Sequence, residues 1–218
     1  MSIFGERRGY LSGIRKSAML HVAGIVSLVA LFLGACNTVA PNRLSASETA
    51  DLRFTALDVQ MPETARLRWS GGEAAYLRAR GIDSNDPALI ATPQARAAIR
   101  DIAAERVKAV LQRALASRPE GTRPAKLSMT ITEIEIASPA QRIVLGGGTS
   151  FIRADIEIRD QRTNALLTTY VGGLGGQYSG SGLIGVVTDA ALEAGGRDDL
   201  FDRTAEAYAK SFVRWLTP

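Results

Sequence analysis

Alternating apolar and polar residues predict β-strands at four places along the chain, namely 52–61, 126–136, 149–159 and 165–171. The run at 149–159 is the clearest of the four, because every second residue is apolar and charged residues stand between them. Its apolar positions are expected to face the core and are Ile152, Ala154, Ile156 and Ile158.

The other runs add details of register and order. In 126–136 the apolar parity changes after Ile131, which predicts a bulge near Thr132. In 52–61 the run is stopped by Pro62, which cannot donate a backbone hydrogen bond. The last three runs lie close together in the sequence, with a tight connection at 160–164, so we expect consecutive antiparallel strands.

Two segments show helical spacing instead. From about 93 to 117 apolar residues recur at steps of three and four, after Thr92 as a cap and Pro93 at the first helical position. A last helix is predicted to begin at Asp198 or Asp199, whose carboxylates suit the positive end of the helix dipole. Its apolar face, expected to pack on the sheet, comprises Phe201, Ala205, Tyr208, Phe212 and Trp215 or Leu216.

The order strand, helix, three strands, helix predicts an α+β fold. It is expected to contain an antiparallel-rich sheet of about four strands, with the two main helices packed on one face. The segment 63–91 shows no sustained period, and its pattern leaves either a short helix or a short strand open.

The amino end has the pattern of an export signal. Four basic residues, Arg7, Arg8, Arg15 and Lys16, precede an apolar stretch at 22–33, and small residues follow it. The segment Leu33-Gly34-Ala35-Cys36 resembles the lipobox of bacterial lipoproteins. A soluble secreted protein and an uncleaved anchor are the alternatives, although an anchor of about 17 residues, from Met19 to Ala35, is short for a membrane span.

The lipobox resemblance implies cleavage between Ala35 and Cys36 and lipid attachment to Cys36. The expected organisation is a signal peptide at 1–35, a flexible tether at 36–50 and one α+β domain at 51–218. Because each buried methylene contributes about 0.8 kcal/mol, two or more acyl chains would hold the protein firmly to a membrane. Asn37 follows the cysteine, and the resemblance then implies the outer membrane, with the domain on the periplasmic face.

Composition limits the chemistry of the predicted mature chain. His21 is the one histidine and lies in the signal, while Cys36 is the one cysteine and would carry lipid. Imidazole-dependent nucleophiles and the usual zinc or copper sites are therefore excluded. From Cys36 onward there are 22 basic and 21 acidic residues, so the high pI does not indicate nucleic-acid binding. We expect no enzyme, no cofactor and no metal.

Candidate sites in the sequence compete with structural explanations. The string GSGLIG at 180–185 fits a dinucleotide fingerprint, but no parallel strand directly precedes it, so loop glycines are the better interpretation. The carboxylates Glu133, Glu135, Asp155 and Glu157 could meet across two strands as an acid/base pair or cation site, although half-solvated sheets commonly carry such residues. A possible binding loop is marked by Gly172, Gly173, Gly175, Gly176, Gly180, Gly182 and Gly185.

The second half of the domain carries a family resemblance. The segments MTITEIEI, VLGGGTSF and IEIRDQRTNALLTTY, followed by a helix, are similar to a family of bacterial outer-membrane lipoproteins with a domain of unknown function. The hairpin also resembles those of penicillin-binding-protein activators and the curli secretion lipoprotein. The resemblance implies a membrane-anchored envelope lipoprotein and carries no established activity.

Three functions are compatible with these features. The leading hypothesis is a non-catalytic binding or assembly module, whose partners are the membrane, through its anchor, and another envelope protein. The alternative is a carrier of a lipid or other amphiphile in an apolar pocket roofed by residues 172–194. The third is a hydrolase that uses carboxylates such as Glu133 and Asp155.

The signal and lipobox generate a direct prediction. Intact-mass analysis of protein extracted from membranes should find a chain that begins at Cys36 and carries the mass of attached acyl chains. A chain with an unmodified Cys36 sulfur and the basic leader still attached would contradict it.

Overall fold

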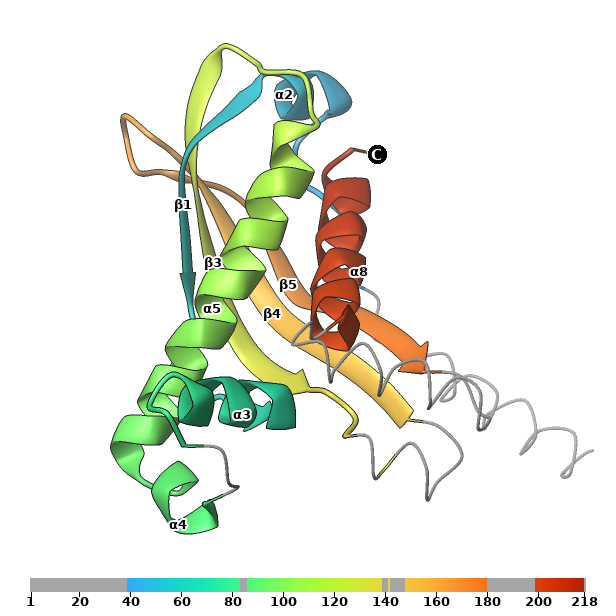
Figure 1. Ribbon diagram of the computed structural model, residues 1–218. Helices are drawn as coiled ribbons and strands as arrows, with labels where there is room; N and C mark the ends of the chain where they lie inside the picture. The colour runs from blue at the N-terminus through green and yellow to red at the C-terminus, as the bar shows by residue number, and fades with distance from the viewer. Residues whose placement is uncertain (1–38, 83–85, 139–140, 142–147, 180–198, 218) are drawn as a thin grey trace, which may run out of the picture. The chain divides into compact units, whose positions relative to one another are not determined.

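A computed structural model describes residues 39–82, 86–138, 141, 148–179 and 199–217 of the 218-residue chain. One compact unit begins at Val39 and contains all of these residues (Figure 1). The predicted signal peptide, the cleavage site at Ala35 and the lipid site at Cys36 lie outside the described residues.

The centre of the unit is a mixed sheet with the strand order β1-β3-β4-β5. Strands β3 (Arg123–Glu135), β4 (Gly148–Asp160) and β5 (Leu166–Ser179) are antiparallel neighbours, as predicted. Strands β1 (Leu52–Gln60) and β2 (Arg66–Arg68) each pair in parallel with β3. The predicted α+β class and antiparallel-rich sheet are confirmed.

Local sequence patterns explain the register of β3 and β4. A register shift between Ile131 and Glu133 confirms the bulge predicted near Thr132, which brings Ile134 back to the buried face. The four inward residues predicted for β4 are fully buried, namely Ile152, Ala154, Ile156 and Ile158. The tight connection at 160–164 is confirmed as a turn in which Asn164 adopts a positive φ of 59°.

The segment 63–91 holds β2, α3 (Ser70–Arg78) and α4 (Pro87–Ile90), so both elements left open by its pattern are present. These elements are too short to display a repeating period. Asp86 caps α4, since its side chain accepts hydrogen bonds from the backbone of Ala88 and Leu89. Trp69, just before α3, is buried and stacks on Phe201 with ring centroids 4.2 Å apart.

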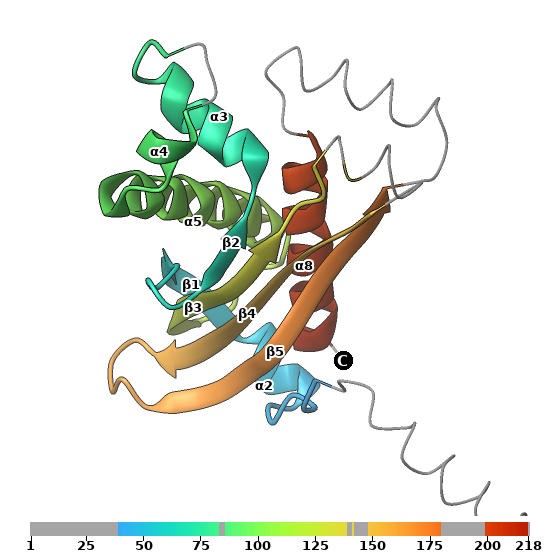
Figure 2. The same cartoon turned by 90° about the horizontal axis from the view of Figure 1, so that it is seen from below.

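The two main helices, α5 (Pro93–Ala116) and α8 (Asp199–Leu216), cover the same face of the sheet (Figures 1 and 2). The Thr92 hydroxyl accepts a hydrogen bond from Ala95 N, which confirms the predicted cap. The predicted apolar face of α8 is buried, with Trp215 half-buried at its edge. Tyr208 Oη donates to the Ala154 carbonyl at 3.1 Å, so this buried phenol keeps a partner.

Strand β5 corrects the prediction of a glycine-rich loop after Val171. Gly172, Gly173, Gly175 and Gly176 continue the strand. A Cβ at Gly173 would overlap the Tyr170 ring, and one at Gly175 would overlap the Tyr208 backbone, so both glycines allow close packing. Gly172 has a φ of +65° at a register shift, and its N–H donates to the Asp155 carboxylate.

The first described residues correct the predicted extent of the tether. Residues 46–50 of the expected flexible tether form α2 (Ala46–Ala50), and Val39 and Leu44 pack against the core. The physical reason is a capping box: the Glu48 amide donates to the Ser45 hydroxyl, and the Glu48 carboxylate accepts from Ser45 N. The folded unit therefore includes residues assigned to the tether.

Among the described residues, every helix is too short or too polar to cross a bilayer.

The packing of α8 on β5 generates a stability prediction. Gly175→Ala should lower the free energy of unfolding by about 1–3 kcal/mol, because the new methyl group forces α8 away from the sheet. Gly176→Ala is the matched control: its Cβ would meet its nearest neighbour at 3.4 Å, and we expect a change within about 0.5 kcal/mol. Urea unfolding measures both, and equal midpoints for the two variants would refute the packing role.

Candidate functional site

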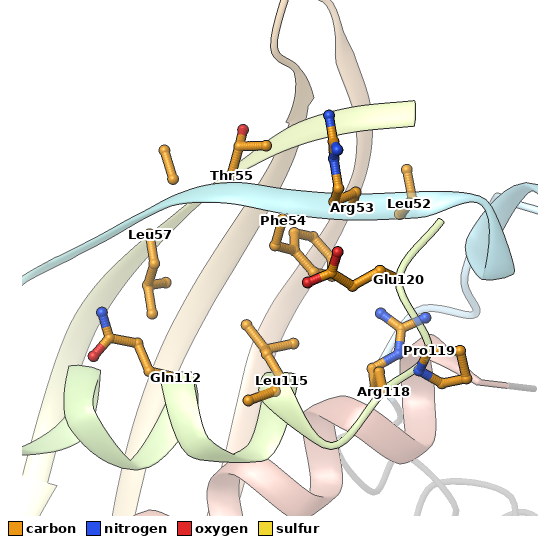
Figure 3. Close-up of a pocket in the computed structure, with 12 residues that line it drawn as sticks. Leu52, Arg53, Phe54, Thr55, Leu57, Gln112, Leu115, Arg118, Pro119 and Glu120 are labelled. Carbon is orange, nitrogen blue, oxygen red and sulfur yellow. The ribbon is translucent and has the colours of Figure 1, made fainter. Parts of the chain in front are cut away.

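A groove opens between the edge strand β1 and the C-terminal part of α5 (Figure 3). We call it the β1–α5 groove, and its volume is about 290 Å³. Its lining comes from three segments of the chain: Leu52, Arg53, Phe54, Thr55, Ala56 and Leu57 from β1; Gln112, Leu115 and Ala116 from α5; and Arg118, Pro119 and Glu120 from the loop after α5.

The edge of β1 forms one side of this groove. Among the described residues, β1 pairs with β3 alone, so its other edge has no strand beside it. The β1 lining is a continuous run of six residues, although successive side chains of a strand point to opposite faces. The strand edge itself therefore borders the groove, with backbone donors and acceptors that no neighbouring strand pairs.

Apolar side chains form the floor. Phe54, Leu57 and Leu115 are half-buried and point into the space between β1 and α5 (Figure 3). A register shift between Phe54 and Ala56 explains how Phe54 and Leu57, three residues apart, reach the same side of the strand. Thr55, the extra residue, donates its hydroxyl to the Ala125 carbonyl at 3.3 Å.

Arg118 forms the charged end of the groove. Its guanidinium donates to the Thr49 carbonyl at 3.1 Å and lies 5.6 Å from the centre of the Phe54 ring. Burial lowers the pKa of the Arg118 guanidinium, which stays protonated because an arginine pKa is so high. Arg53 and Glu120 are exposed at the rim, so the groove offers both signs of charge beside an apolar floor.

The loop after α5 is fixed by its contacts with the start of β1. The Asp51 carboxylate accepts from the Thr122 hydroxyl at 2.7 Å and from Thr122 N at 2.9 Å. These two hydrogen bonds, the hydroxyl first, lower the pKa of Asp51 below its usual value. A Cβ at Gly121 would overlap the Asp51 backbone, so glycine permits this approach. The groove is thus held open by an ordered loop.

The lining of the groove combines a strand edge, apolar side chains and one carboxylate. Glu120 is the one carboxylate among the residues that line the groove, and it is exposed. The lining therefore does not contain a pair of carboxylates. What the lining does provide is a strand edge, three half-buried apolar side chains and charges at the rim.

The register keeps apart the four carboxylates that could have met across two strands. Glu133 lies opposite Arg153, while Asp155 lies opposite Thr130. Glu133 forms ion pairs with Arg66 at 3.4 Å and Arg153 at 3.3 Å, and Asp155 binds the Gly172 amide. Glu135 and Glu157 pair with Arg68 and Arg159 in turn.

The pairing register keeps Glu133 and Asp155 apart, because Arg153 and Thr130 are their respective partners across the ladder. Within the described parts of the chain, no group of histidine, cysteine, aspartate and glutamate residues could hold a metal ion.

The glycines of the possible binding loop are divided between two parts of the chain. Gly172, Gly173, Gly175 and Gly176 lie in β5, where two of them make room for tyrosines. Gly180, Gly182 and Gly185, with the rest of the string at 180–185, lie outside the described residues.

A second groove, of about 490 Å³, lies between β2, α3, α4 and α5. Its lining mixes the buried apolar residues Trp69 and Ile99 with the charged residues Glu63, Glu73 and Arg96. It lacks the continuous run of strand residues that borders the β1–α5 groove.

The sequence contained one unused indication of the β1–α5 groove. Leu52, Phe54, Leu57 and Val59 are spaced by two, three and two residues, so the parity break marks the bulge at Thr55. The position of Leu115 opposite this bulge depends on the crossing of α5 over β1, which no local pattern specifies.

No protein-family model matches the chain, and no curated protein matches it. Similar solved structures include a Caulobacter crescentus protein provisionally assigned as a lipoprotein, with 13% identity, a TM-score of 0.38 and coverage of 79% of this chain and 92% of that one. A PelC variant dodecamer from Paraburkholderia phytofirmans has 12% identity and a TM-score of 0.36, with coverage of 82% of this chain and 94% of that one. Lipoprotein GNA1162 of Neisseria meningitidis has 18% identity and a TM-score of 0.20, with coverage of 66% of this chain and 95% of that one. Such low TM-scores carry no argument, so the lipid anchor stays a sequence prediction.

Proposed function

We propose that the protein is a lipid-anchored envelope protein that binds an extended segment of another envelope protein in the β1–α5 groove. The observation that carries this proposal is the run from Leu52 to Leu57, where β1, which pairs with β3 alone among the described residues, borders an apolar floor. Addition of a strand to an exposed sheet edge is a common mode of peptide recognition.

Backbone and side chains would contribute differently to such a complex. Backbone hydrogen bonds along the β1 edge supply affinity that is independent of the partner's sequence. Phe54, Leu57 and Leu115 accept apolar side chains of the segment, since they are half-buried and gain further burial on binding. Arg53, Arg118 and Glu120 favour a segment with complementary charges at its ends.

The bulge at Thr55 restricts which strands can add. A bulge disrupts the ladder locally and increases the strand twist. A partner strand would pair regularly on one side of Thr55, and it would need its own irregularity to continue past that residue. Bulges and charges protect natural sheet edges from indiscriminate pairing, so this edge would be selective.

Lipid attachment and a non-catalytic role are the other two parts of the proposal. The basic leader, the apolar stretch and the lipobox-like Leu33-Gly34-Ala35-Cys36 support lipid attachment to Cys36. Asn37 favours the outer membrane, which would place the domain on its periplasmic face. A non-catalytic role is supported by a mature chain without histidine or free thiol.

Site-specific photocrosslinking in intact membranes tests the binding proposal. A photoreactive residue at Ala56, which is exposed in the groove, should capture a discrete envelope protein. The same probe at Ala97, exposed on α5 away from the groove lining, should not capture that protein. Identical capture from both positions, or no discrete product from Ala56, would overturn the proposal.

A substitution in the floor should weaken the same complex. Leu57→Ala should reduce crosslinking from Ala56 by about fivefold or more, since an interface anchor contributes over 1 kcal/mol. Leu167→Ala is the matched control, because Leu167 is also half-buried against the core but lies on β5, outside the groove. Equal loss in both variants would attribute the effect to stability and contradict a role of the floor.

A further inference from the structure

The chain is pinned to the folded unit from its first described residues. Trp215 Nε1 donates to the Ala40 carbonyl at 2.7 Å, at the C-terminal end of α8. The Asn42 side chain accepts from the Thr168 hydroxyl at 3.1 Å and donates to the Thr49 hydroxyl at 3.4 Å. These bonds connect the start of the unit to β5, α2 and α8.

These hydrogen bonds at the start of the unit limit how far it can move from its anchor. Our inference rests on the lipid attachment to Cys36 in the proposed function. Val39 already packs against the core, and it follows Cys36 by three positions. A fully extended chain spans at most about 3.6 Å per residue, so the lipidated residue can lie no more than roughly 11 Å from Val39.

Several segments share the end of the unit where Val39 lies. We call it the anchor end and define it by residues 39–51, the turn at 117–122, the turn at 161–164 and the end of α8 (Figure 1). Arg118 bonds Thr49, Thr122 bonds Asp51, and Gln161 N donates to the Pro124 carbonyl, so these segments are connected by direct contacts.

We propose that the anchor end lies against the phosphate-bearing headgroups of the membrane. The short covalent connection leaves little room for any other part of the unit to reach the surface. Arg43, Arg162 and Arg214 are exposed at this end, and no carboxylate of the described residues forms an ion pair with them. Basic residues close to an anionic membrane each contribute about fivefold to surface affinity.

The anchor end has a small excess of positive charge. Its charged residues are four arginines, Arg43, Arg118, Arg162 and Arg214, and three carboxylates, Glu48, Asp51 and Glu120, which gives 4 − 3 = +1. Glu48 accepts from Ser45 and Asp51 accepts from Thr122, so local hydrogen bonds hold these two carboxylates close to the protein surface. The attraction of the exposed arginines falls off over a Debye length of about 8 Å at physiological salt, so it acts only when the anchor end is close to the headgroups.

The orientation has a consequence for the groove. Arg118, which closes one end of the β1–α5 groove, bonds the carbonyl of Thr49 at the anchor end. A segment bound in the groove would therefore lie close to the headgroups, as a membrane-adjacent stretch of a partner does.

Fluorescence quenching tests the orientation with the lipidated full-length mature chain. The predicted mature protein has no cysteine besides Cys36, so Ala50→Cys on α2 and Ala88→Cys on α4 each provide one site for a fluorophore. The protein is placed in vesicles of phosphatidylethanolamine and phosphatidylglycerol that contain headgroup-nitroxide lipids. The label at position 50 should be quenched several-fold more than the label at position 88, and equal quenching would overturn the orientation.

Intact mass of the same sample separates this inference from the proposed anchor. A missing acyl mass on Cys36 overturns the anchor and the inference together, whereas a lipidated chain with equal quenching overturns the orientation alone.

A longer connection isolates the contribution of charge. With a glycine-serine linker inserted before Val39, preferential quenching at position 50 should persist. It should fall when Arg43→Gln, Arg162→Gln and Arg214→Gln are combined, and it should remain in the control that combines Arg78→Gln, Arg96→Gln and Arg100→Gln. Equal loss in the two triple variants would overturn the electrostatic part of the proposal.

Discussion

Helices α5 and α8 cover the same face of the sheet, and their packing on it shapes the rest of the described structure. Helix α8 approaches β5 closely because Gly173 and Gly175 have no side chain, and Tyr170 and Tyr208 fill the space beside them. Residues of α8, α5 and the sheet fill the core between the helices and the strands. Helix α5 crosses β1 at the sheet edge, where a gap remains and becomes the β1–α5 groove. The proposed recognition would therefore take place at a sheet edge next to the anchor end.

Much of the fold was predictable because β3, β4, α5 and α8 are long and strongly patterned. The inward residues of β4, such as Ile152 and Ile156, alternate without interruption, and the Thr132 bulge followed from a change of parity. The glycine-rich end of β5 was misread as a loop, since glycine has low strand propensity and its packing against α8 is a tertiary effect. Strand β2 and α4 were left open because three and four residues cannot show a repeating period, and α3 was left open because two glycines, Gly71 and Gly72, stand in its first turn.

The candidate site was less predictable than the fold. Residues 39–50 have the composition of a tether, yet the serine and glutamate of a capping box, Ser45 and Glu48, were a local indication of α2. The spacing of Phe54 and Leu57 revealed a bulge, but the groove also requires Leu115, brought there by a helix crossing. The carboxylates seemed able to meet because strand parity was visible, whereas the register that separates Glu133 from Asp155 was not.

The proposed orientation depends most on residues 39–50 being part of the folded unit, because this would shorten the connection to the membrane and set which end faces it. Hydrogen–deuterium exchange of the mature protein tests this claim directly. The amides of Thr49 and Asp51, which donate within α2, should be protected. Thr122, whose amide donates to Asp51, should be protected with them. Exchange of residues 44–51 at the rate of an unstructured peptide, with β3 and β4 still protected, would contradict the proposed orientation.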